Sequence, residues 1–143
     1  MKKIFLLILM SLSTYCVQSQ ELKIDKNQNN SAGIDKRIVE VFGNQLENLV
    51  LNDTQRLSDL TDILDNRTEI IEQKNTSNEK YLKLSSVPLF NKYNQNLERD
   101  KIFNKNNFNV LKYDLEFYAK SVKVYRIDNT NYLLVIQPQN LKR

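Results

Sequence analysis

Apolar and polar residues follow two different patterns near the C-terminal end of the chain. Residues 111–117 alternate strictly between apolar and polar side chains, which predicts a half-buried β-strand. Residues 132–136 form an uninterrupted apolar run, which predicts a strand covered on both faces. Between them, the phase of the alternation changes at 118–121, and residues 128–131 have hairpin-turn chemistry. Together these segments predict an antiparallel β-meander.

The chain before residue 68 has the periodicity of helices instead. One apolar face with helical spacing is formed by Ile34, Ile38, Val41 and Phe42, and Gly43 is expected to end that helix. Asn52 and Asp53 offer an N-cap for a second helix. Its apolar stripe is Leu57, Leu60, Ile63 and Leu64, and Asn66 is expected to end it in a left-handed conformation. Helices followed by strands predict a small α+β domain, with two or three N-terminal helices packed on a C-terminal antiparallel β-meander.

The middle of the chain is harder to assign. Residues 68–71 are a candidate strand, residues 81–84 its candidate returning partner, and Val87 is expected to be extended because it precedes Pro88. Residues 91–109 are rich in Asn and Lys, with one helical turn expected near 95–100. Aromatic residues recur through this stretch, so the 86–109 loop is either an interaction surface or a connection pinned to the core. The candidate interaction residues are Phe90, Tyr93, Phe103 and Phe108.

The first 19 residues have the three-part pattern of a secretory signal peptide. Lys2 and Lys3 precede an apolar run at 4–10, and a polar stretch closes at residues 17–19. The apolar run is too short to cross a bilayer. Cys16 could instead be lipidated, but the residues before it lack the Leu-small-small spacing of such sites, so removal of 1–19 is favoured. The predicted organisation is a signal peptide (1–19), a flexible leader (20–33) and one domain (34–143), with no transmembrane span in the mature chain.

Composition excludes several chemistries. The chain has 143 residues, one cysteine and no histidine, and the cysteine lies in the predicted signal peptide. The mature chain therefore offers no disulfide, no Cys/His metal site and no Cys- or His-based catalytic set. We accordingly expect no enzyme, no catalytic residues and no cofactor. The net charge is +4, and the Lys and Arg residues are not clustered, which argues against a nucleic-acid partner. We interpret Asp59, Asp62 and Asp65 as a solvated helix face and not as a metal site.

Three segments resemble small exported proteins of flavobacteria and other Bacteroidota, namely residues 84–93, 108–113 and 124–132. The resemblance implies the envelope of a diderm bacterium, in the periplasm or at the periphery of the outer membrane. It carries over no catalytic or binding residue.

The function expected from these observations is that of a non-enzymatic interaction subunit or adaptor with a protein partner in the cell envelope. One alternative is an accessory component of an outer-membrane secretion machine of the type IX kind. Another is a small-ligand-binding or inhibitor domain, which would need a concave apolar cavity of roughly 300 Å³ or more. A flat or shallow apolar patch would favour a protein partner.

Overall fold

The computed structural model describes residues 33–73 and 80–139, which belong to one compact unit. The predicted signal peptide and nearly all of the predicted leader lie outside the described residues. Within the described ranges, no helix has the length and apolar character needed to cross a membrane.

The first helix, α1 (Lys36–Phe42), forms at Ile38, Val41 and Phe42 as predicted, but Ile34 lies before its cap. Asp35 caps its N-terminus by accepting a hydrogen bond from the Arg37 backbone N–H at 2.8 Å. Gly43 follows the helix with φ of 47°, a conformation that glycine adopts without steric cost. A 3₁₀ turn, η2 (Gly43–Gln45), and a π-helical turn, η3 (Glu47–Leu51), then lead to the second helix.

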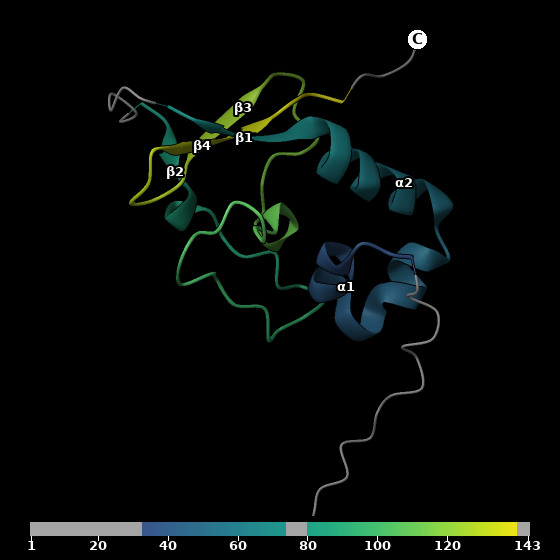
Figure 1. Cartoon of the computed structure of the whole chain (residues 1–143). Helices are drawn as coiled ribbons and strands as arrows, with labels where there is room; N and C mark the ends of the chain where they lie inside the picture. Colours follow the sequence, from purple (N-terminus) through teal and green to yellow (C-terminus); the bar gives the residue numbers. More distant parts are fainter. Residues whose placement is uncertain (1–32, 74–79, 140–143) are drawn as a thin grey trace, which may run out of the picture. The chain divides into compact units, whose positions relative to one another are not determined.

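The second helix, α2 (Thr54–Asp62), also starts at its predicted cap, since Asp53 accepts from the Arg56 backbone N–H at 3.0 Å. The predicted left-handed stop at Asn66 is wrong, because Asn129 is the one non-glycine residue with positive φ in the described ranges. The helix instead continues as a π-helical turn, η4 (Ile63–Arg67), and passes directly into the first strand (Figure 1). Buried Arg67 marks this junction by donating to the carbonyls of Phe117 and Gln137.

The sheet has four strands: β1 (Thr68–Glu72), β2 (Leu82–Lys83), β3 (Lys123–Arg126) and β4 (Tyr132–Ile136). Their order is β1-β4-β3-β2 (Figure 1). β3 and β4 form the predicted hairpin, with Asn129 at φ of 55° in the turn. β2 pairs parallel to β3, so the expected pairing of residues 81–84 with β1 is wrong. The α+β class is confirmed, but the sheet is mixed and is not a meander.

The predicted strand at 111–117 is also wrong. Its first residues form a 3₁₀ turn, η6 (Val110–Lys112), and Tyr113 makes one isolated bridge to Leu89. The N–H groups of Leu115 and Phe117 bond two residues back along the chain, so they are not available to a neighbouring strand. Leu111, Tyr113 and Leu115 are nonetheless buried. The alternation correctly indicated which side chains are buried. The backbone N–H groups, however, bond within the segment and not to a neighbouring strand.

The core lies between one face of the sheet and the helices. Leu134 and Ile136 of β4 belong to it, together with Tyr125 of β3 and Ile38, Val41 and Phe42 of α1. Leu133 and Val135 point to the opposite face of the sheet and are also buried. The prediction that 132–136 is a strand buried on both faces is therefore confirmed.

Candidate functional site

β2 is followed by a 3₁₀ turn, η5 (Leu84–Ser86), and residues 87–109 then run along the core with no helix or strand beyond the Leu89–Tyr113 bridge. A turn closes between Asn94 and Leu97, where the Leu97 N–H bonds the Asn94 carbonyl at 3.1 Å. The helical turn expected over 95–100 does not form. Val87 is extended, as its position before Pro88 predicts. Arg99 ties the middle of the loop to its beginning, because its guanidinium donates hydrogen bonds to the carbonyls of Leu84 and Val87.

The four candidate aromatic residues separate into two pairs. The ring centroids of Phe103 and Phe108 lie 5.4 Å apart. The rings of Phe90 and Tyr93 lie 5.5 Å apart, and Tyr93 stacks on Phe42 of α1 at 5.4 Å. Phe108 is 7% exposed, and the other three are partly buried against the core. These aromatics thus fix the loop to the domain and do not form one shared binding surface.

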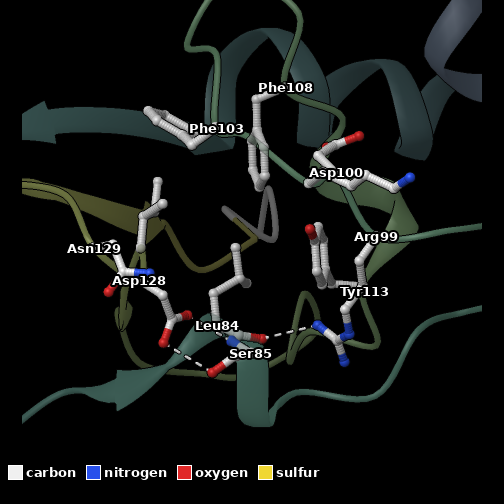
Figure 2. A pocket seen from close by; sticks show the side chains of 11 residues that line it. Leu84, Ser85, Arg99, Asp100, Phe103, Phe108, Tyr113, Asp128 and Asn129 are labelled. Atoms are coloured by element: carbon white, nitrogen blue, oxygen red, sulfur yellow. Dashed lines mark hydrogen bonds between the residues drawn. The ribbon is translucent and has the colours of Figure 1, made fainter.

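The Phe103–Phe108 pair borders a hollow of about 150 Å³ (Figure 2). We call this space the loop hollow. Its apolar floor consists of Leu84, Phe103, Phe108, Tyr113 and Ile127. Its polar rim consists of Ser85, Arg99, Asp100, Lys101, Asp128 and Asn129. The hollow therefore lies where the 99–108 loop meets the β3–β4 turn and the residues after β2.

Most charges on this rim already have partners within the domain. Asp128 accepts 2.8 Å hydrogen bonds from both the backbone N–H and the Oγ of Ser85. Desolvation raises the pKa of the Asp128 carboxyl, but the Ser85 bonds and nearby Lys83 outweigh it, so the pKa is lowered. Asp100 accepts from Lys112 Nζ at 2.6 Å. Arg99 is engaged by backbone carbonyls, whereas Lys101 makes no ion pair within the described part of the chain.

Phe90 lines a second hollow, of about 190 Å³, between α1, α2 and residues 111–118. The Arg56 guanidinium lies over the rings of Phe42 and Tyr93, 5.3 and 5.6 Å from their centroids. A hydrogen bond from Arg56 lowers the pKa of the Tyr93 hydroxyl. Arg56 lines this hollow together with core residues such as Val41 and Leu60.

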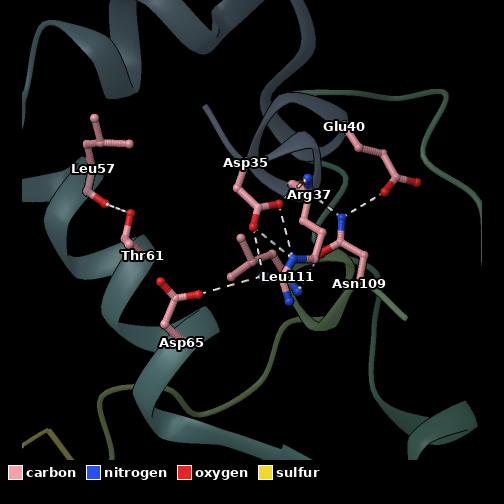
Figure 3. A network of polar contacts seen from close by, with 8 residues as sticks. All are labelled: Asp35, Arg37, Glu40, Leu57, Thr61, Asp65, Asn109 and Leu111. Atoms are coloured by element: carbon pink, nitrogen blue, oxygen red, sulfur yellow. Dashed lines mark hydrogen bonds and ion pairs between the residues drawn. The ribbon is translucent and has the colours of Figure 1, made fainter. Parts of the chain in front are cut away.

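A buried polar network ties the end of the loop to α1 (Figure 3). Asn109, 2% exposed, donates from Nδ2 to the Arg37 carbonyl at 2.9 Å and to Glu40 Oε2 at 2.7 Å. Its Oδ1 accepts from the Leu111 N–H at 3.1 Å. Arg37 in turn pairs with Asp35 at 2.7 Å, and their hydrogen bond lowers the pKa of the Asp35 carboxyl. The network therefore holds the end of the loop against α1.

Lys112 is a buried cation at the end of the loop. It is 5% exposed, and its Nζ lies 2.6 Å from Asp100 and 3.4 Å from Glu40. Desolvation lowers the pKa of Lys112, but the two carboxylates outweigh it and the pKa is raised. Three charges therefore meet where the loop crosses α1. Asp100 and Lys112 are 12 residues apart in the sequence, and this separation did not indicate a contact between them.

Ile102 was also missed by the sequence analysis. It is 85% exposed, although both of its neighbours, Lys101 and Phe103, line the loop hollow. An isolated isoleucine within a polar, Asn- and Lys-rich stretch was the available signal. Its exposure means that it contributes little to the core.

The described residues hold no group of three or more acidic side chains arranged for a metal ion. Asp62 lies 3.8 Å from Arg67, and Asp65 lies 3.9 Å from Arg37. Asp59 accepts from Gln55 at 2.8 Å. Each of these three carboxylates thus has a separate partner on or beside α2.

Comparison with known proteins gives no further identification. No protein-family model, no curated protein and no solved structure matches this chain.

Proposed function

We propose that this protein is a non-enzymatic, exported interaction subunit of a larger cell-envelope assembly, and that it binds a protein partner at the loop hollow. The observation that carries the proposal is the position of Ile102, 85% exposed, between two residues that line a preformed hollow. An exposed apolar side chain beside an apolar recess with a polar rim is the arrangement found at protein-binding hot spots.

The size of the loop hollow favours a partner's side chain over a small molecule at this position. Pockets for small molecules are usually about 300–1,000 Å³, whereas the loop hollow and the second hollow hold about 150 and 190 Å³. A space of that size accepts one side chain. We infer that the partner inserts an apolar side chain into the hollow and covers Ile102.

The chemistry of the rim supports a binding role without catalysis. The chain has no histidine to act as a general base. The two rim carboxylates, Asp100 and Asp128, are already engaged by Lys112 and Ser85. Carboxylates that already have partners within the domain define the shape and polarity of the rim.

The N-terminal pattern supports the export part of the proposal. Two lysines followed by a short apolar run are typical of a cleaved secretory signal, and exported proteins of diderm bacteria act in the envelope.

The test is a capture experiment in the native envelope. C-terminally tagged protein is cross-linked mildly in its own cells, purified and analysed by mass spectrometry, alongside Ile102→Asp. Val122→Asp is the matched control, because Val122 is an apolar side chain, 48% exposed, at the opposite end of β3 from the hollow. We expect the wild type and Val122→Asp to capture the same protein, and Ile102→Asp to capture at least about tenfold less, a loss of roughly 1.4 kcal/mol. Equal capture by all three, or capture of no protein by the wild type, would contradict the proposal.

A further inference from the structure

β1 forms one edge of the sheet, at the end opposite β2. Within the described part of the chain it pairs with β4 alone. It has five residues, whereas β2 at the other edge has two. The strand contains no proline, no lysine and no bulge, which are devices that protect many edge strands, and its charges are those of the exposed Glu69 and Glu72. Such an edge readily accepts a further strand.

The register with β4 identifies the backbone groups that face the open edge. Gln73, the residue after β1, donates its N–H to the carbonyl of Asn131, which lies opposite it. Bonded and non-bonded pairs alternate along an antiparallel ladder, so the odd-numbered residues of β1 bond β4. The backbone N–H and C=O groups that point away from β4 are those of Thr68, Ile70 and Glu72. These three residues are spaced symmetrically about Ile70.

We propose that two copies of this chain pair through β1, antiparallel, about a two-fold axis beside Ile70, and thereby join their four-stranded sheets into one. In this register Ile70 lies opposite Ile70 of the second copy, and Thr68 of each copy lies opposite Glu72 of the other. All of these are bonded pairs, so each outward-facing N–H and C=O group of β1 meets its complement. The edge is therefore self-complementary, which a two-fold interface requires.

The neighbouring registers match less well. An axis beside Glu69 would place Glu69 opposite its own copy, a like-charge pair. An axis beside Ile71 would move Thr68 past the end of the facing strand and leave its backbone groups without a counterpart in β1. With the axis beside Ile70, Glu69 lies opposite Ile71, and no glutamate lies directly opposite another.

The other edge of the sheet is a poorer partner for β1. β2 has two residues, too few to match the three outward-facing residues of β1. Pairing of β1 with β2 of the next copy is also head-to-tail, and such contacts give open chains of molecules unless the rotation closes a ring. Pairing of β1 with itself closes after two copies.

Side chains on both faces of β1 would gain contacts in the dimer. Ile70 already packs against the core, and Ile70 of the second copy would extend that packing across the interface. Ile71 lies on the opposite face of the strand and is 36% exposed. The aliphatic part of Glu69 of the second copy would cover it.

The dimer surface is separate from the loop hollow. The hollow is lined by residues that follow β2, by the 99–108 loop and by the β3–β4 turn, and it takes none from β1. This inference therefore goes beyond the proposed function and does not depend on it. A dimer would carry two loop hollows.

Sedimentation equilibrium of the predicted mature chain, residues 20–143, tests for the dimer. We expect a reversible monomer–dimer equilibrium. Glu72→Pro removes an N–H that faces the open edge and leaves the bonds to β4 in place. Because two symmetry-related hydrogen bonds are lost, the dissociation constant of the dimer should rise by at least about tenfold. Glu72→Ala is the matched control: it keeps the N–H and should dimerise at least as tightly as the unsubstituted chain. A monomer at every concentration, or equal dimerisation by the two variants, would overturn the proposal.

Single cysteines test the register without a proline, because residues 20–143 contain no cysteine. With the axis beside Ile70, Ile70→Cys places the two cysteines opposite each other with Cα atoms about 5.5 Å apart, within reach of a disulfide. In Glu69→Cys and in Ile71→Cys the two cysteines lie roughly 8 Å apart, beyond that reach. We expect Ile70→Cys alone to oxidise to a covalent dimer. Faster oxidation at position 69 or 71, or no covalent dimer from any of the three variants, would overturn the proposal.

Discussion

The 86–112 segment has an inner side and an outer side that differ in what they contact. The inner side consists of Phe108, Asn109 and Lys112, each less than a tenth exposed and each bonded or packed to another element. The outer side consists of Lys101 and Ile102, which face solvent. This segment is thus held to the domain mainly by side-chain contacts.

This difference separates stability from binding. Changes on the inner side should alter the free energy of unfolding, and changes on the outer side should alter binding alone. An aromatic residue in a long loop is therefore not by itself evidence of an interface, since Phe108 lies in the floor of the hollow and Ile102 lies beside it.

The largest expected effect is that of Phe108→Ala. Phe108 packs between Phe103 and Tyr113, with centroids at 5.4 and 5.6 Å. Removing its ring should lower the free energy of unfolding by about 3–5 kcal/mol, measured by urea denaturation. A loss below about 1 kcal/mol would show that the Phe108 ring does not contribute to the packing of the core.

The next largest effect is expected for Asn109→Ala. The substitution removes three hydrogen bonds and takes their partner away from the Arg37 carbonyl and the Leu111 N–H, which should cost about 3 kcal/mol. Asn107→Ala, two residues earlier and exposed, is the control and should change stability by less than about 0.5 kcal/mol. Similar losses in both variants would mean that the network does not position the loop.

The rim of the hollow should show a smaller, pH-dependent effect. The pKa of Asp128 is lowered in the fold, so its stabilising contribution is present above the unfolded pKa of about 3.8 and is lost as the pH falls through the lower folded value. Ser85→Ala removes one of the responsible bonds. At pH 6 the variant should be less stable than the wild type by about 1 kcal/mol, and the difference should shrink towards pH 2–3. A difference that is constant with pH would assign the effect to packing.

The smallest effect on stability is expected for Ile102→Asp. Because Ile102 is 85% exposed, the free energy of unfolding should change by less than about 0.5 kcal/mol. A destabilisation above about 1 kcal/mol would mean that Ile102 packs on the domain and that its loss of binding could not be interpreted.

The sequence predicted the parts of the fold that local chemistry determines. Asp53 was recognisable as a cap for α2, Gly43 as a helix end, and residues 128–131 as a hairpin turn. The run 132–136 was recognisable as a buried strand because all its side chains are apolar. Each of these signals lies within a few residues of the element that it specifies.

The errors involve contacts between distant residues. The alternation at 111–117 indicated which side chains are buried, but periodicity does not distinguish a sheet ladder from a segment whose N–H groups bond locally. β2 pairs with β3, about forty residues away in sequence, and β1 pairs with β4, so neither strand pairs with its neighbour along the chain. The Asn109 and Lys112 contacts with α1 join residues far apart in sequence, and no local pattern encodes them.

Site-specific photocross-linking tests the central claim most directly. A photoreactive amino acid would replace Ile102 in one variant and Glu47, an exposed residue of η3, in another. Both would be illuminated in the native envelope. We predict one discrete protein adduct from position 102 and none from position 47. No adduct from position 102, or the same adducts from both positions, would contradict the proposal that the outer side of the loop binds a specific partner.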